Sequence, residues 1–224
     1  MTDAYTPELS NESSRSPREQ IVRDIIKGLY EGRYVPGQRL VEADLTQQYG
    51  ASRGPVREAL NWLSAHGIVS LTLQRGAQVR RLSKQEALDV LVVVEPLVGL
   101  AARLAATHIG TPKAAALLKG ALADLTRFDP SSGGPEHAYA RDRFYGALIR
   151  IGGNEELRRI MPRVLIHLVR VQYRNALKPV DETRHADYQE IAREVLRARP
   201  DSAQKVARAH IVKTLAAVQE APEP

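Results

Sequence analysis

The chain has 224 residues, a hydrophobic fraction of 43% and a formal net charge of +6, and it contains no cysteine. The length allows two small domains with buried cores. The lack of cysteine excludes disulfide bonds and thiolate metal sites and favours the cytoplasm. The sequence lacks a run of about 18 apolar residues, so we expect no membrane-spanning helix. Residues 1–16 are polar and are expected to be a disordered tail, not a signal peptide.

Three helices are predicted after this tail. Apolar residues recur at helical spacing over 17–32, and shorter helices are predicted over 42–49 and 54–66. Gly50 and Ala51 form the turn between the two short helices. Two short helices joined by a tight turn are typical of a helix–turn–helix DNA-binding motif.

A β-hairpin is predicted next, because the β-prone segments 68–73 and 77–80 flank a turn at Gln74-Arg75-Gly76. Three helices and a hairpin make a winged helix–turn–helix domain over 17–81. This region carries ten Lys and Arg against six Asp and Glu, which suits a polyanionic partner, although a basic surface that is merely solvated would look the same.

The second half of the chain is predicted to be all-helical. From Ser83 onward no segment reads convincingly as a strand, and Gly- and Pro-rich turns separate the helical stretches. The predicted helices cover 84–108, 112–127, 136–151, 155–178, 182–198 and 201–219. The fold class is therefore mostly α: a winged domain, then an all-α six-helix bundle over 82–219, with a short tail at 220–224.

The start of the third helix carries the residues best suited to read DNA. Arg53 and Arg57 lie four residues apart on one helix face, and arginine can bind guanine through two hydrogen bonds, each good pair giving about 1–3 kcal/mol of discrimination. Ser52 is a plausible N-cap whose hydroxyl can also bind a phosphate, and Gly54 permits close approach of the backbone. A small helical domain with solvated arginines is the alternative interpretation. The DNA-binding candidates, with the wing tip, are Ser52, Arg53, Gly54, Arg57, Arg75 and Gly76.

Several motifs then agree with a known family. In the first half they are Pro36-Gly37-Gln38-Arg39-Leu40, Leu45 to Gly50, Ser52 to Leu60, Gly67-Ile68-Val69 and Arg75-Gly76-Ala77. These resemble the GntR family of bacterial transcription regulators. In the second half Glu95-Pro96-Leu97, Ala101 to Ala106, Arg143-Phe144-Tyr145 and Gly153-Asn154 resemble the helical effector domain of its FadR-like (FCD) subgroup.

The resemblance implies a homodimer that binds a short, roughly palindromic operator in double-stranded DNA through paired winged domains. It also implies that a small organic acid or related metabolite binds in the helical domain and changes DNA affinity. Repression relieved by the ligand is the commoner arrangement in the family. The family's DNA contacts fall on the six candidates already named.

Many FCD domains hold a divalent metal with one Asp and three His, and the resemblance places these ligands at Arg141, Tyr145, Tyr188 and His210. Only His210 keeps the family's residue, and a guanidinium group in place of a carboxylate should repel a metal ion. We therefore expect no metal cofactor. A shifted metal site that uses His185 and Asp142 stays open.

The replaced ligands suggest an anion site instead. Arg141 can bind a carboxylate directly through a charge-assisted pair of hydrogen bonds. The predicted helix 155–178 adds Arg163, His167, Arg170 and Arg174 on one face, although such a stripe can also be solvated or pair with acids of a neighbouring helix. The effector-binding candidates are Arg141, Tyr145, His167, Arg170, Tyr188 and His210.

The leading hypothesis is thus a cytoplasmic, ligand-responsive transcription regulator that is not an enzyme. An enzyme fused to a DNA-binding domain is the first alternative, but no catalytic triad order, phosphate-binding glycine loop or GxGxxG motif is present. A non-specific architectural DNA protein is the second, and it leaves a separate helical domain of about 135 residues unexplained.

Overall fold

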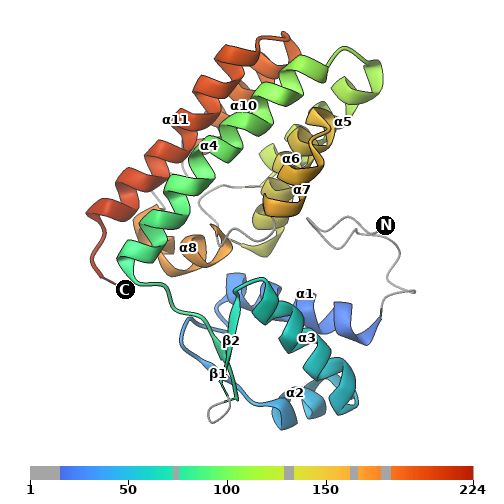
Figure 1. The fold of residues 1–224 in the computed structure, drawn as a ribbon, viewed down its shortest axis with the longest axis vertical. Helices are drawn as coiled ribbons and strands as arrows, with labels where there is room; N and C mark the ends of the chain where they lie inside the picture. The colour runs from blue at the N-terminus through green and yellow to red at the C-terminus, as the bar shows by residue number, and fades with distance from the viewer. Residues whose placement is uncertain (1–15, 73–75, 129–133, 162–165, 178–182, 224) are drawn as a thin grey trace.

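The computed structural model describes residues 16–72, 76–128, 134–161, 166–177 and 183–223. The N-terminal helices and a small sheet form one body, and the remaining helices form a second body above it in Figure 1. The mostly α fold class, with an N-terminal winged helix–turn–helix and a helical C-terminal domain, is confirmed.

The first domain contains α1 (Pro17–Glu31), α2 (Glu42–Tyr49) and α3 (Arg53–Ala65). The Ser16 hydroxyl accepts a hydrogen bond from the Glu19 amide and caps α1, and Gly32 ends this helix with a φ of 78°, a conformation that suits glycine. Ile21, Ile25, Leu60 and other apolar residues of the three helices are buried in the core.

The wing is a three-stranded antiparallel sheet in the order β1-β3-β2. Strands β2 (Val69–Thr72) and β3 (Gly76–Val79) form the expected hairpin, with Val69 opposite Val79. A third strand, β1 (Arg39–Leu40), was not predicted and pairs with β3. Two residues are too few to show a strand period, so only the pairing with β3 reveals this strand.

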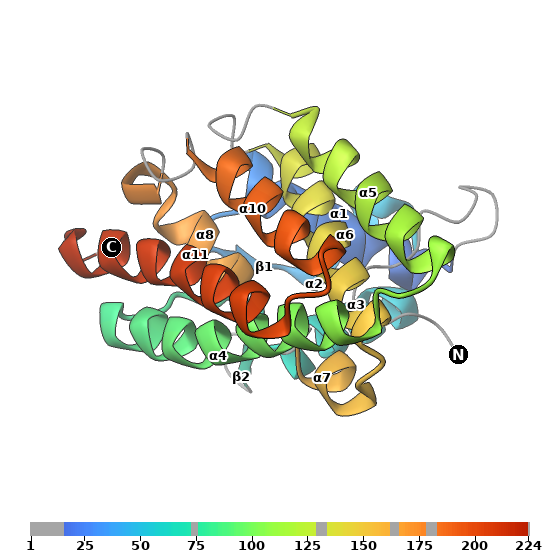
Figure 2. The ribbon, with the colours of Figure 1, turned by 90° about the horizontal axis from the view of Figure 1, so that it is seen from above.

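The second domain is built on α4 (Lys84–His108) and α11 (Pro200–Glu220), which run antiparallel. Glu95 of α4 forms an ion pair with Arg208 of α11, and the Lys84 ammonium donates to the Ala221 carbonyl beyond the end of α11. Both views show these helices side by side (Figures 1 and 2). One 18-residue window of α4 has a mean hydropathy of 1.8, long and apolar enough to cross a membrane, but α4 packs against α11 and α6 as a core helix does.

The other helices of this domain are packed on or near the pair. They are α5 (Pro112–Thr126), α6 (Pro135–Gly152), α7 (Glu155–Ile160), α8 (Ile166–Gln172) and α10 (Arg184–Leu196). The predicted continuous helix over 155–178 is wrong, because the described residues form α7 and α8 as separate helices. Pro162 stands between them in the sequence, and a proline cannot donate the backbone hydrogen bond of a helix interior. Residues 220–223, expected to be a tail, include the buried Ala221.

Candidate nucleic-acid interface and buried polar pocket

The start of α3 presents its polar residues to solvent. Ser52 holds the N-cap position in an extended conformation, and its side chain makes no capping hydrogen bond, so the hydroxyl can turn to a phosphate. Arg53, Gly54 and Arg57 are exposed, and a Cβ added to Gly54 would meet no atom within 4 Å. This end of α3 is therefore open to a large partner.

Arg57 already has a carboxylate partner. Its Nε lies 2.9 Å from Oε2 of Glu42 in the first turn of α2, with the two side chains 65% and 42% exposed. Exposed ion pairs contribute little to stability, so a DNA phosphate or base could replace Glu42 at small cost. Glu42 could not be identified from the sequence, since the contact depends on how α2 and α3 cross.

The wing contributes Gly76, the first residue of β3, whose φ is 72°. This left-handed conformation is one that glycine adopts without strain. Arg75, the predicted minor-groove contact, lies outside the described residues.

Three of the predicted effector-binding residues meet inside the second domain. The ring centres of Tyr188 and His210 are 4.8 Å apart, and Tyr145 lies 6.1 Å from Tyr188 and 6.4 Å from His210. Phe144 packs against Tyr188 with ring centres 5.3 Å apart. All four rings are buried, so α6, α10 and α11 meet at an aromatic cluster.

His210 is held between a cation and an anion. The Arg184 guanidinium donates to His210 Nε2 at 2.8 Å, and His210 Nδ1 lies 3.1 Å from Oδ2 of Asp187. Since a guanidinium group only donates, Nε2 must accept, and the proton sits on Nδ1 and is donated to Asp187. Burial and the Arg184 charge lower the pKa of His210 to about 3.

Arg184 and Asp187 were missed by the sequence analysis. Arg184 is only 1% exposed and also donates to the Thr214 hydroxyl. Burial alone would raise the pKa of Asp187, but hydrogen bonds from His210 and Lys213 outweigh it and lower this pKa to about 2. The spacing carried a weak signal: Arg184 precedes Tyr188 by one turn of α10, and Thr214 follows His210 by one turn of α11.

These contacts do not fit a divalent metal. The Nε2 lone pair of His210, which a metal would need, accepts the Arg184 hydrogen bond, and Arg141, Tyr145 and Tyr188 stand at the other ligand positions. Across the described ranges, no group of three or more His, Cys, Asp or Glu is placed to hold a metal ion. The shifted site with His185 and Asp142 gains no support from those residues.

Arg141 lies at a separate point of the same polar interior. Its Nη2 donates to the Tyr30 hydroxyl at 3.1 Å and lies 3.6 Å from Oδ1 of Asp142. The Tyr30 hydroxyl is also 2.6 Å from His167 Nδ1. Burial opposes the charge of Arg141, but Tyr30 and Asp142 raise its pKa above the ordinary value, whereas burial lowers the pKa of His167 and raises that of Tyr30 to about 12.

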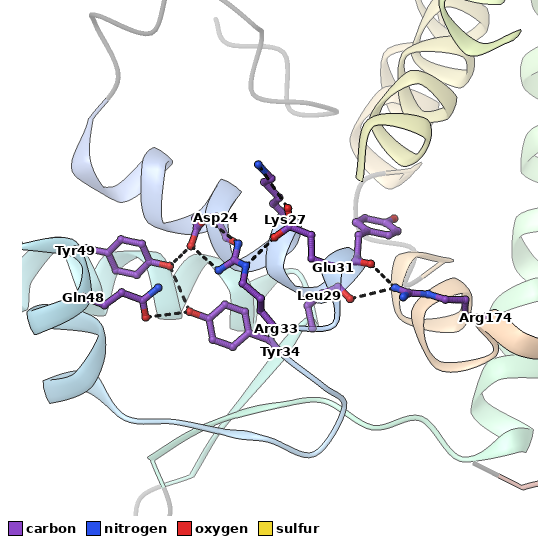
Figure 3. A network of polar contacts seen from close by, with 10 residues as sticks. Asp24, Lys27, Leu29, Glu31, Arg33, Tyr34, Gln48, Tyr49 and Arg174 are labelled. Carbon is purple, nitrogen blue, oxygen red and sulfur yellow. Dashed lines mark hydrogen bonds and ion pairs between the residues drawn. The ribbon is translucent and has the colours of Figure 1, made fainter. Parts of the chain in front are cut away.

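A small open pocket lies beside Arg141. The residues that line it come from both domains: Tyr30, Gly134, His137, Ala138, Arg141, Arg170 and Arg174. Of the predicted basic stripe, Arg163 lies outside the described residues, while His167, Arg170 and Arg174 face α1 or the pocket. Arg174 donates to the carbonyls of Leu29 and Tyr30 at the end of α1 (Figure 3).

Positive charge is concentrated in this interior. Arg141, Arg170 and Arg184 are all buried, and all three lower the pKa of Tyr145 against the stronger opposing effect of burial, which raises it. Burying charge is unfavourable unless opposite charge or hydrogen bonds compensate it. The chemistry of this set suits an anion with several oxygen atoms.

Comparisons with known proteins match both domains of the chain. The profile described as bacterial regulatory proteins, gntR family, matches residues 17–79, and the FCD domain profile matches residues 87–213. The chain is 27% identical over 206 residues to the HTH-type transcriptional repressor GlaR of Escherichia coli (strain K12), which covers 88% of this chain and 92% of GlaR.

A second relative is the probable D-xylose utilization operon transcriptional repressor of Paenarthrobacter nicotinovorans. It is 29% identical over 139 residues, which span 62% of this chain and only 61% of that protein. Two solved structures are similar in fold: E. coli McbR/YncC, with a TM-score of 0.74 at 19% identity and coverage of 92% and 99%, and a GntR regulator from Rhodococcus sp. RHA1, with a TM-score of 0.75 at 19% identity and coverage of 93% and 100%.

Proposed function

The chain belongs to the GntR family of bacterial transcription regulators and carries an FCD domain, and from this premise we propose that it is a cytoplasmic, non-enzymatic repressor whose operator affinity changes when a small anionic metabolite binds in the helical domain. The operator is double-stranded DNA, and the metabolite is an organic acid that binds without a metal cofactor.

The exposed end of α3 supports the DNA-binding part of the proposal. Ser52, Arg53, Gly54 and Arg57 lie together at this end, where helix dipole and free amides also favour a phosphate. Arg53 and Arg57 can then reach base edges in the major groove while the wing lies over the adjacent backbone or minor groove.

The single observation that carries the effector part is the gathering of buried Arg141, Arg170 and Arg184 around phenol and imidazole groups. Arg141 would hold the carboxylate and Arg170 would add charge at the pocket, and His167 would act through its contact with Tyr30. Tyr145, Tyr188 and His210 do not line this pocket and would take part only if the ligand reached their cluster. The occupied Nε2 of His210 supports a site that works without a metal.

A thermal-shift screen of organic acids tests this part, with and without a chelator. Hits should persist in chelator and should disappear in Arg141→Ala, while Arg150→Ala, an exposed arginine on the same helix, should behave as the wild type. Hits that need a divalent metal, or that survive Arg141→Ala, would contradict the proposed site.

An exposed apolar face supports the homodimer. Val92 and Val93 of α4 are 59% and 50% exposed, and Val212 of α11 is 50% exposed. The antiparallel pairing of Glu95 with Arg208 places Val212 of α11 at the level of Val92 on α4, and exposed apolar residues close together favour an interface. Val92→Glu with Val212→Glu should give a monomer in sedimentation, whereas Val35→Glu, equally exposed in the first domain, should not. A double variant that stays dimeric would place the interface elsewhere.

A further inference from the structure

The end of α1 is bound to the helical domain through its side chain and its backbone. Tyr30 is buried although it belongs to the DNA-binding domain, and its hydroxyl reaches two groups that lie 111 and 137 residues further along the chain. Arg174 of the helical domain donates to the Leu29 and Tyr30 carbonyls (Figure 3). The pocket wall therefore includes a residue of the other domain.

The Tyr30 hydroxyl makes two hydrogen bonds to the helical domain. It accepts a hydrogen bond from Arg141 Nη2, and it donates to Nδ1 of His167. The phenol has a single proton and already accepts from Arg141, so the 2.6 Å contact is satisfied when His167 carries its proton on Nε2 and its Nδ1 accepts. One neutral oxygen thus occupies the position in which Arg141 would hold an oxygen of an anion.

A carboxylate is the stronger partner for this guanidinium. It offers two charged oxygens in the fork geometry that arginine matches, whereas the phenol offers one neutral oxygen at 3.1 Å. Arg170 and Arg174 line the same pocket and would add to the attraction for an anion but not for a phenol. A carboxylate oxygen and the Tyr30 hydroxyl cannot both occupy the position beside Arg141 Nη2.

We propose that Tyr30 is a placeholder for the effector carboxylate, and that a carboxylate bound at Arg141 displaces the Tyr30 hydroxyl and releases the end of α1 from the helical domain. This inference rests on the proposed effector function. It adds that the ligand site spans the domain boundary and that the ligand and the DNA-binding domain compete for one guanidinium group.

The consequence for DNA binding follows from packing within the first domain. Ile21, Ile25 and Leu29 of α1 are buried in the same core as Leu60 and Leu63 of α3. Movement of α1 would therefore carry the recognition helix with it. A ligand that binds the released arrangement better shifts the population towards it, and so changes the spacing of two winged domains on an operator.

Hydrogen–deuterium exchange of the full chain tests the contact itself. Tyr30→Phe is compared with Tyr34→Phe, which removes a hydroxyl bonded to Gln48 and Tyr49 within the first domain. Without ligand, Tyr30→Phe should raise exchange about fivefold at residues 28–32 and 166–172, the effect of one net hydrogen bond. Tyr34→Phe should leave 166–172 unchanged. Equal exchange in the wild type and in Tyr30→Phe would overturn the placeholder.

Benzoate, succinate and citrate then serve as probes, at ionic strength matched with sodium chloride. A carboxylate that binds should protect residues 135–152 and raise exchange at residues 28–32 in the wild type, and it should bind Tyr30→Phe about fivefold more tightly. Protection of 135–152 with no change at 28–32 would overturn the placeholder and leave the proposed function standing. No binding of any probe to either protein would overturn the proposed ligand class and the displacement with it.

Discussion

The DNA-binding domain and the helical domain of this molecule use arginine in opposite ways. At the start of α3, Arg53 and Arg57 are exposed, and Arg57 has a partner that water can replace. In the helical domain, Arg141, Arg170 and Arg184 are buried. An exposed guanidinium is free to serve a partner molecule, whereas removing a buried one leaves its neighbours without hydrogen bonds. Substitution of the exposed arginines of α3 should alter DNA binding, and substitution of the buried arginines of the helical domain should alter stability.

The largest effect is expected at the DNA-binding end. Arg53→Ala combined with Arg57→Ala should weaken operator affinity at least about 30-fold, since each good arginine–base pair gives about 1–3 kcal/mol. The free energy of unfolding should hardly change, because both side chains are exposed. Fluorescence anisotropy at one fixed salt concentration measures the affinity, with Arg150→Ala as the control. Unchanged operator affinity would show that these arginines do not read DNA.

Substitution of a buried arginine should instead lower the free energy of unfolding. Arg184→Met removes the donors that serve His210 Nε2 and the Thr214 hydroxyl, so the free energy of unfolding should fall by about 1–3 kcal/mol. Arg197→Met, whose side chain is 54% exposed at the end of the same helix, should cost less than about 0.5 kcal/mol. Denaturant unfolding measures both. An equal loss of unfolding free energy in the two variants would show that buried and exposed arginines do not differ in their effect on stability.

Acid should also destabilise the buried site. The pKa of His210 is about 3 in the folded chain, below the ordinary value of 6.5, so the unfolded chain binds an extra proton between these values. Stability should fall as the pH drops below 6.5, by about 2 kcal/mol between pH 7 and pH 5. Asp187, with a lowered pKa of about 2, acts in the same direction at lower pH.

The matched variant is His210→Gln, whose amide oxygen can still accept from Arg184. It should remove the part of the pH dependence between pH 7 and pH 5 that His210 contributes and leave the part due to the buried His167, while His108→Gln, at an exposed histidine, should retain both parts. Denaturant unfolding at the two pH values measures the difference. A pH dependence that survives in full in His210→Gln would show that His210 is not the group responsible.

The smallest expected effect is at the exposed ion pair. Glu42→Gln removes the partner of Arg57 and a negative charge close to the predicted phosphate contacts. Operator affinity should rise by less than about fivefold, with almost no change in unfolding free energy. Anisotropy at low and high salt measures the effect, which should shrink as salt increases. A loss of affinity would mean that Glu42 positions Arg57 on DNA.

The local features of the chain could be predicted from sequence because they depend on neighbours in sequence. The winged fold, the end of α2 at Gly50 and the Ser52 N-cap position follow from spacing and capping preferences within a few residues. The break between α7 and α8 was missed, although Pro162 stood in the sequence, because the apolar spacing continued on both sides of it.

The sequence by itself determined the fold class, the family and the places where polar residues replace the family's metal ligands, since these depend on residue type and spacing. Only the tertiary structure decided that Arg184 and Asp187 enclose His210, and that Tyr30 crosses the domain boundary to Arg141. Such pairs are joined by the packing of whole helices. A buried charge needs a compensating partner, and here the partners are distant in sequence, so no local pattern predicts them.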